Sequence, residues 1–299
     1  MSLPALIELL GPLASCRSFG VVLGCGAFWR RDGFGDAAGV SGMFRGVSGG
    51  FGVARALDVG MSYRERAWIF IRSFAAAWGD ALAEDDGTPG TGLAQAEAML
   101  GCLLPAALHE FYALVGSRPG LVAIQGRLLP SREVFVDDVC GGVLVFRSEN
   151  QGCAFWGVCL TGLDRDDPPV IVQARHGWVP FLDRVSLACV EFVLSEALFG
   201  GGGGLCNACE LSADLLGAVP EYFQRVQLPD CPMWTGPEEF PVRWFSAPGK
   251  LLRQDGLSVH SWLHVRGRTR ADLDAICAAV PGRWSLGCTE SLSFEPLPF

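Results

Sequence analysis

Lysine is almost absent from this chain of 299 residues. Lys250 is the single lysine, so arginine supplies nearly all of the positive charge among 23 basic residues, while 32 residues are acidic. The net charge of -9 disfavours sequence-independent binding to nucleic acid, because a phosphate backbone repels an acidic protein. The same charge promotes solubility and would attract a basic protein. We therefore expect no nucleic-acid partner.

Long apolar runs are also missing. The longest uncharged stretch near the start, residues 18–29, is shorter than the roughly 20 residues that a membrane-spanning helix needs. The first residues include Glu8 and no basic cluster, which disfavours a secretory signal peptide. These features predict a cytoplasmic protein without a membrane partner. Its 12 cysteines are then expected to be reduced and mostly buried as small hydrophobic side chains.

A constellation for nucleophilic catalysis is not evident. The one match to G-x-S-x-G, at residues 46–50, falls in the glycine-rich start, where no strand-to-helix turn is visible, and the four histidines, His109, His176, His260 and His264, are scattered. His176 is the most interesting because it lies close to Trp178, although a turn at a strand end explains Arg-His-Gly-Trp as well. We expect a protein that is not an enzyme, with no catalytic residue and no cofactor.

One C-x-x-C pair raises the question of a metal or redox site. Cys206 and Cys209 supply two ligands, whereas a closed structural zinc site requires four. Cys231 with His260 or His264 would complete the set, but the spacings match no common zinc pattern. A redox motif would sit between a strand and a helix, and this pair follows a glycine loop. We expect no metal, and stoichiometric zinc in the purified protein would contradict this.

An acidic turn contains Asp164, Asp166 and Asp167, just before Pro168 and Pro169. A calcium loop of the EF-hand type needs a central glycine and a distal glutamate at fixed positions, and this stretch has neither. The turn is therefore interpreted as a solvated connection.

Glycine dominates the first 62 residues, with 13 glycines among the first 60 positions. Glycine raises the entropic cost of ordering and adds no side chain to a core. We therefore predict that residues 1–62 are a disordered extension and that removing residues 1–60 leaves folding intact. No Gly-Lys-Ser/Thr sequence follows these glycines, which argues against a phosphate-binding loop.

Apolar residues at helical spacing predict helices from Tyr63 onward. They cover residues 63–82, residues 93–101 and a stretch after Pro105 that Gly116 would end with a left-handed cap.

Two further helices are expected later in the chain. Ser186 can cap a long helix that ends in the glycine loop 200–204. Thr269 and Asp272 form a capping box at the start of another.

Short runs rich in β-branched and aromatic residues predict strands from residue 143 onward. Strands at 143–146 and 154–160 flank a polar corner at residues 147–152, to which Arg147 is assigned, and should pair in antiparallel fashion. Additional strands are predicted at 170–173, 242–245, 250–253 and 258–266. The expected fold class is α+β, with a central, mostly antiparallel sheet flanked by helices and a C-terminal β-rich extension. The core domain is placed at residues 63–200 and the extension, packed on that core, at residues 201–299.

The corner between the first two strands carries three consecutive polar side chains, Glu149, Asn150 and Gln151, followed by Gly152. These side chains can bond the exposed backbone of the turn and so fix the strand register. They can also face a partner, and the sequence leaves both interpretations open.

Four pieces of this chain, in this order, resemble the SUKH superfamily, which is named for the yeast cell-wall-assembly regulators and their bacterial relatives. They are L-x-x-A-E-x-x-L-G-x-x-L-P-x-x-L-x-x-F-Y-x-x-x-G at 93–116, the corner Glu149–Gly152 with Trp156-Gly157, the turn Asp166–Val170, and Trp178 before a helix. By this resemblance, the structural residues of the family's motifs are Leu104, Pro105, Phe111, Tyr112, Gly152, Trp156, Gly157 and Pro168.

The resemblance implies an α+β domain without enzymatic activity. Many bacterial members are immunity proteins, which bind and neutralise a cognate toxin, often a nuclease, whereas yeast members are signalling scaffolds. The partner expected here is a protein toxin with a basic nuclease domain, and the alternative is a regulatory scaffold in cell-envelope or signalling control. The residues expected to contact the partner are Glu149, Asn150, Gln151, Asp166, Asp167 and Trp178.

Overall fold

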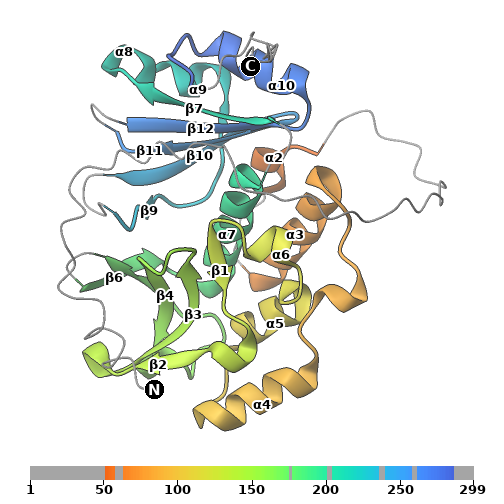
Figure 1. Ribbon diagram of the computed structural model, residues 1–299, viewed down its shortest axis with the longest axis vertical. Helices are drawn as coiled ribbons and strands as arrows, with labels where there is room; N and C mark the ends of the chain where they lie inside the picture. Colours follow the sequence, from red (N-terminus) through yellow and green to blue (C-terminus); the bar gives the residue numbers. More distant parts are fainter. Residues whose placement is uncertain are drawn as a thin grey trace, which may run out of the picture. The chain divides into compact units, whose positions relative to one another are not determined.

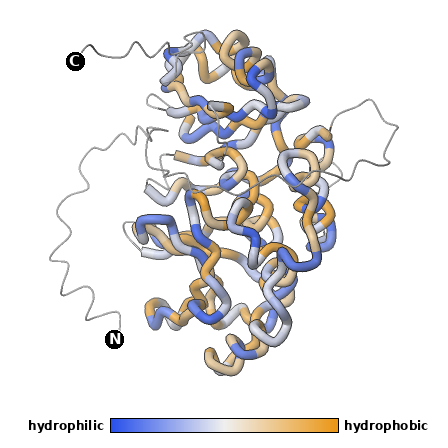
Figure 2. Tube along the Cα trace, turned by 45° about the vertical axis from the view of Figure 1, so that its right-hand side comes forward, coloured by the Kyte–Doolittle hydropathy of each residue, from blue (hydrophilic) through white to orange (hydrophobic). Residues whose placement is uncertain are grey.

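The computed structural model describes residues 51–57, 63–174, 177–200, 204–235, 240–257 and 261–285 (Figure 1). These residues form helices and two sheets whose strand pairs are antiparallel, which confirms the predicted α+β class. Hydrophobic and hydrophilic residues are interspersed along most of these elements (Figure 2), as expected for helices and strands that bury one face and expose the other to solvent.

The first sheet has the order β1-β3-β4-β5-β6, and β2 also pairs with β3. Its strands are β1 (Gly126–Leu128), β2 (Phe135–Asp137), β3 (Val143–Glu149), β4 (Phe155–Cys159), β5 (Val170–Ala174) and β6 (Gly177–Leu182). The predicted pairing across the polar corner is confirmed, because β3 and β4 are antiparallel neighbours.

A glycine allows β3 and β4 to approach each other closely. A Cβ atom on Gly157 would lie 2.4 Å from Val143 Cγ1 and 2.7 Å from the Leu144 carbonyl oxygen. Such distances are far inside van der Waals contact, so any side chain there would push the strands apart. Gly157 thus permits the close pairing of β3 and β4.

Three helices before the first sheet follow the predicted pattern: α3 (Arg64–Trp78), α4 (Gly90–Leu100) and α5 (Ala106–Val115). A fourth, short helix, α6 (Pro119–Val122), was not predicted. The predicted left-handed cap at Gly116 is wrong, since its φ is -60°; Gly101 after α4 adopts that conformation instead, with φ 70°. Gly116 is required for a different reason, because its Cβ would lie 2.1 Å from Thr88 Oγ1.

Helix α7 (Val185–Phe199) lies between the two sheets (Figure 1). Fourteen of its 15 residues are buried, so it is enclosed on all sides and has no solvent-facing stripe. It contacts α3, α5 and α6, the β6 strand of the first sheet, and two strands of the second sheet, β11 (Lys250–Asp255) and β12 (Ser261–Gly267). The long helix after Ser186 was predicted, although it begins one residue earlier, at Val185.

The second sheet has the order β7-β12-β11-β10-β8, and β9 pairs with β10. Its strands are β7 (Cys206–Leu211), β8 (Gln224–Arg225), β9 (Cys231–Pro232), β10 (Pro241–Ala247), β11 (Lys250–Asp255) and β12 (Ser261–Gly267), accompanied by α8 (Ala213–Leu216), α9 (Ala218–Tyr222) and α10 (Arg270–Ala279). The predicted capping box of α10 is confirmed: the amide of Asp272 donates to Thr269 Oγ1 at 3.1 Å, and the amide of Thr269 donates to Asp272 Oδ2 at 3.1 Å.

One hydrophobic core includes residues of the first sheet, of α7 and of one face of the second sheet. The cluster that includes most of α7 also contains Trp244 and Leu251 of the second sheet. A smaller cluster lies on the other face of that sheet, where Leu273 and Ile276 of α10 pack against Leu263 of β12. Side chains on both sides of residue 200 therefore share the same core.

Helix α2 (Val53–Leu57) falls inside the segment that was predicted to be disordered. Val53 and Leu57 are each 1% exposed, and the Ala54 amide donates to Ser246 Oγ of β10 at 3.0 Å. The prediction of disorder was wrong for this stretch. Two buried side chains and one long-range hydrogen bond offset the conformational entropy that is lost when this glycine-rich segment becomes ordered. Residues 1–50 and 58–62 of the predicted extension lie outside the described residues.

The burial of α2 changes what truncation should do. We expect residues 61–299 to be less stable than residues 51–299, because the shorter chain lacks α2 altogether. We expect Leu57→Ala in the full chain to cost about 2–5 kcal/mol of unfolding free energy, because it leaves a cavity where the buried side chain was. Urea unfolding followed by circular dichroism measures both differences. Equal midpoints for the two truncated chains would show that α2 contributes nothing.

Candidate functional site

The polar corner closes the turn from β3 to β4 through its own backbone. Glu149 Oε2 accepts hydrogen bonds from the amides of Gln151 at 2.7 Å and Cys153 at 3.3 Å. Gly152 has φ 73°, a conformation that a glycine adopts without strain. The Asn150 amide donates to the Gln125 carbonyl at 3.1 Å, which ties the corner to the segment before β1. The carboxylate of Glu149 is thus part of the corner's structure, while the side chains of Asn150 and Gln151 are exposed.

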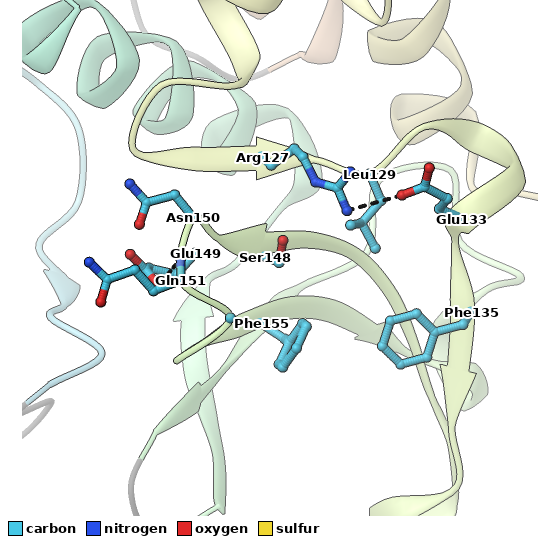
Figure 3. Close-up of a pocket in the computed structure, with 10 residues that line it drawn as sticks. Arg127, Leu129, Glu133, Phe135, Ser148, Glu149, Asn150, Gln151 and Phe155 are labelled. Atoms are coloured by element: carbon cyan, nitrogen blue, oxygen red, sulfur yellow. Dashed lines mark hydrogen bonds and ion pairs between the residues drawn. The ribbon is translucent and has the colours of Figure 1, made fainter. Parts of the chain in front are cut away.

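This corner forms one end of a groove with a volume of about 460 Å³. The rings of Phe135 and Phe155 form one side of it, with centroids 6.1 Å apart and nearly perpendicular planes (Figure 3). Leu129, which is buried, and Ser148 also line the groove. The groove therefore combines a partly apolar wall with a polar end, the arrangement in which interfaces often seat an anchoring side chain.

An ion pair between Arg127 and Glu133 borders the groove opposite the two rings (Figure 3). The guanidinium nitrogen and the carboxylate oxygen are 3.0 Å apart, and the side chains are 49% and 38% exposed. Glu133 also lies 3.8 Å from the guanidinium of Arg132. Exposed pairs of this kind contribute at most about 1 kcal/mol, so a partner could rearrange them at little cost.

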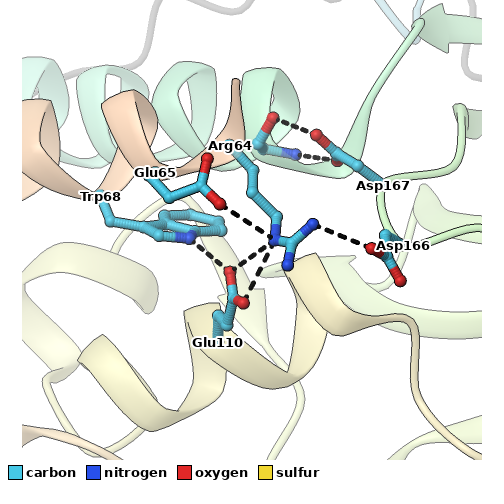
Figure 4. Close-up of polar contacts among 7 residues, drawn as sticks. Arg64, Glu65, Trp68, Glu110, Asp166 and Asp167 are labelled. Atoms are coloured by element: carbon cyan, nitrogen blue, oxygen red, sulfur yellow. Dashed lines mark hydrogen bonds and ion pairs between the residues drawn. The ribbon is translucent and has the colours of Figure 1, made fainter.

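Asp166 belongs to a different polar cluster, which joins α3, α5 and the acidic turn (Figure 4). Arg64 contacts Asp166 at 3.1 Å and Glu110 at 3.1 Å, and Trp68 Nε1 donates to Glu110 at 2.7 Å. Burial alone would lower the pKa of Arg64, but the two carboxylates outweigh it and hold that pKa above its ordinary value. Asp166 therefore helps to hold three elements together.

Asp167 caps α7 from outside the helix. Its carboxylate accepts from the Ser186 amide at 2.9 Å and from Ser186 Oγ at 2.6 Å (Figure 4). A carboxylate in this position satisfies an amide of the first turn and complements the positive end of the helix. Ser186 was expected to be the cap itself, yet it lies within the helix, and the capping oxygen comes from the acidic turn.

The topology separates the residues that were expected to contact a partner. Strand β5 runs parallel to β3, since both are antiparallel to β4. Asp166 and Asp167 precede β5, so they lie at the opposite end of the sheet from Glu149, which ends β3. Trp178 lies at the same end as the corner, and strand alternation places it on the same face as Phe155. Asn150, Gln151 and Trp178 therefore share one end of the sheet with the groove.

The structure also contains a buried ion pair beside the groove that the sequence did not reveal. Arg147 was assigned to the polar corner, but a bulge in β3 turns it toward α7, where it pairs with Glu196. Its guanidinium lies 4.0 Å from the ring centroid of Phe192 and 5.2 Å from that of Trp156. Burial lowers the pKa of Arg147 despite the neighbouring carboxylate.

Glu196 holds the segment that leads into β1. Its carboxylate accepts from the amides of Ile124 at 2.6 Å, Gln125 at 2.8 Å and Gly126 at 2.9 Å, in addition to Arg147. Three successive amides pointing at one carboxylate form an anion-binding concavity. Because Gln125 bonds the corner and β1 borders the groove, this buried carboxylate fixes one side of the candidate site.

A second buried polar network joins α7 to the second sheet. Arg253 donates to Asp255 at 2.7 Å and to Ser195 Oγ at 3.2 Å, and Ser195 Oγ donates to Glu191 at 2.7 Å. Burial raises the pKa of Glu191. For Asp255, burial favours a higher pKa, but Arg253 and His264 outweigh it and lower that pKa. This network cross-links the two layers.

The C-x-x-C pair does not form a chelating site. Cys206 and Cys209 lie three residues apart on β7, so their side chains point to opposite faces of the sheet. Cys206 Sγ lies 3.1 Å from the carbonyl of Leu198 in α7, whereas Cys209 belongs to the cluster on the α10 side. Across the described ranges, no group of three or more histidine, cysteine or acidic residues is arranged to hold a metal ion.

Two of the four histidines, His176 and His260, lie outside the described residues. His264 Nε2 is 3.5 Å from Asp255 Oδ2 in the second network. In the part of the chain that the structure describes, no helix is both long and apolar enough to span a bilayer.

Comparisons with protein families, curated proteins and solved structures gave no match to this chain.

Proposed function

We propose that this protein binds another protein at the groove beside the Glu149–Gly152 corner, and that it acts as an immunity protein of the SUKH type. The observation that carries the proposal is the groove itself. It places exposed amide side chains of Asn150 and Gln151 next to the half-buried rings of Phe135 and Phe155. A polar rim around partly exposed aromatic rings is the composition of an interface hot spot.

The proposed partner is a toxin with a basic, nuclease-type domain. The net charge of -9 favours association with a basic protein, because complementary long-range charge raises the rate of encounter. An acidic protein seated on a nuclease would also repel and block the nucleic-acid substrate. The same surface would suit a scaffold in cell-envelope or signalling control, which is the alternative.

Capture of the partner from the native host distinguishes these two functions. The full chain is the suitable bait, because a chain starting at residue 61 lacks the buried helix α2. Recovery of one basic toxin domain at near-equal stoichiometry, with loss of its nuclease activity on addition of the purified protein, supports the immunity function. Recovery of envelope or signalling proteins alone supports the scaffold.

A matched pair of substitutions tests the surface. We expect Gln151→Arg to weaken binding of the basic partner by about tenfold or more, because it adds a like charge at the rim of the groove. Gln227→Arg makes the same chemical change at an exposed position after β8 that does not line the groove, and should leave affinity unchanged. Calorimetry measures the affinity of each variant for the partner. Equal affinities of the two variants would show that the groove is not part of the interface.

A further inference from the structure

A second pocket, with a volume of about 200 Å³, lies among the ends of α3 and α7, helix α6 and strand β12. Two arginines and one tryptophan line it: Arg118, Arg266 and Trp78. The site is independent of the groove, since it shares none of its lining residues.

Arg266 has an incomplete set of partners. One of its terminal nitrogens donates to the Ala197 carbonyl near the end of α7, and its guanidinium carbon lies 5.7 Å from the ring centroid of Trp78. Its Nε atom is buried and has no hydrogen-bond partner among the described residues. No carboxylate of those residues lies within ion-pair distance of it.

Capping of α7 explains only part of this arrangement. The bond to Ala197 satisfies one carbonyl of the last turn and places a cation at the negative end of the helix. It leaves Nε without an acceptor, and a buried donor without a partner is destabilising. Nε is too buried to be reached from the pocket, but the other terminal nitrogen of Arg266 also has no partner among the described residues and is the donor that a ligand in the pocket can reach.

Arg118 adds a second positive charge to the pocket. Its guanidinium pairs with Asp86 at 2.6 Å and lies 3.8 Å from Asp80. Asp80 lines the pocket as well, but its side chain is 96% exposed, so solvent screens its charge. Asp86 is only 13% exposed and compensates the charge of Arg118, so Arg266 supplies the positive charge of the pocket that no carboxylate of the described residues pairs.

We propose that this pocket binds a small oxyanion, a phosphate or a carboxylate group, between Arg266 and Arg118. Planar guanidinium groups hold such oxygens through paired N–H donors. The volume is below the roughly 300–1,000 Å³ of pockets for drug-sized ligands, so the ligand is small. Trp78 supplies an apolar wall for any carbon part of the molecule.

Titration of the full, isotope-labelled chain with inorganic phosphate tests the site. Ionic strength is held constant with sodium chloride, and the arginine Nε–H resonances report the location. We expect saturable shifts of Arg266 and Arg118 and of the Trp78 indole N–H. Acetate titrated in the same way shows which oxyanion binds more tightly. Absence of a saturable shift at Arg266 with both anions, or an equal response to chloride alone, would overturn the proposal.

A variant pair adds a second test. Arg266→Gln should weaken binding of the oxyanion that gives the stronger response by about tenfold or more, because a charge-assisted bond is lost. Arg243→Gln removes an arginine that pairs with Asp230 at the surface and should bind as the wild type does. Equal affinity of the Arg266 variant and the wild type would overturn the proposal. The titration of the unaltered chain stands by itself if Arg266→Gln does not fold.

Discussion

Glu196→Gln should lower the free energy of unfolding by about 3–5 kcal/mol, which is the cost of breaking a buried ion pair by removing one partner. The substitution leaves the charge of Arg147 buried without its carboxylate. It also replaces an oxygen that accepts backbone amides with a group that cannot accept from all of them. Urea unfolding followed by circular dichroism measures the loss.

Glu133→Gln is the matched control for this substitution. It removes the same charge from an ion pair with Arg127, but both side chains there are more than one-third exposed. A pair in solvent contributes at most about 1 kcal/mol, so the control should unfold close to the wild type. Similar losses of unfolding free energy for the two variants would show that burial of the Arg147–Glu196 pair does not account for its contribution to stability.

Trp156→Ala should cost about 3–5 kcal/mol, because it removes a large ring from the core between the first sheet and α7. The ring is 7% exposed and packs edge to face against Phe181 and Phe192, at centroid distances of 6.2 Å and 6.0 Å. It also lies beside the guanidinium of Arg147. Thermal or urea unfolding measures the change.

Tyr222→Ala provides the comparison for Trp156→Ala. Tyr222 is 58% exposed, and surface substitutions usually change stability by no more than about 0.5 kcal/mol. Near-wild-type stability of the Trp156 variant together with lost partner binding would instead place that ring in an interface.

Local sequence patterns predicted the elements that are stabilised by contacts between residues close together in the sequence. The capping box at Thr269 and the antiparallel pair across the Glu149–Gly152 corner depend on residues a few positions apart, and both are confirmed. Helix α2 could not be found this way, because its burial depends on β10, nearly 200 positions later in the chain. A short apolar stretch in a glycine-rich segment gives no local sign of such a contact.

Strand β7 was missed for a different reason. The spacing of Cys206 and Cys209 drew attention to metal chemistry, although the buried residues of this stretch belong to a strand. Since β7 is held by its pairing with β12, the neighbour that makes it a strand lies far away in sequence.

The candidate site was predicted in part. The corner itself was recognised from three polar residues between apolar strands, and they do lie together at the groove. The assignment of Arg147 to that corner was wrong because a bulge breaks the alternation of side-chain directions along β3. No local sequence pattern indicated this bulge. Phe135 was not singled out either, since β2 reaches the groove only through its pairing with β3.

The protection of backbone amides from hydrogen–deuterium exchange, measured for the full chain with and without its captured partner, tests the central claim most directly. We expect added protection in β1, in β2 and in the corner between β3 and β4, because these segments border the groove. Helix α10 lies on the far face of the second sheet and should exchange equally in both states. Protection confined to α10 or to the second sheet, with no change around the groove, would contradict the proposed site of partner binding.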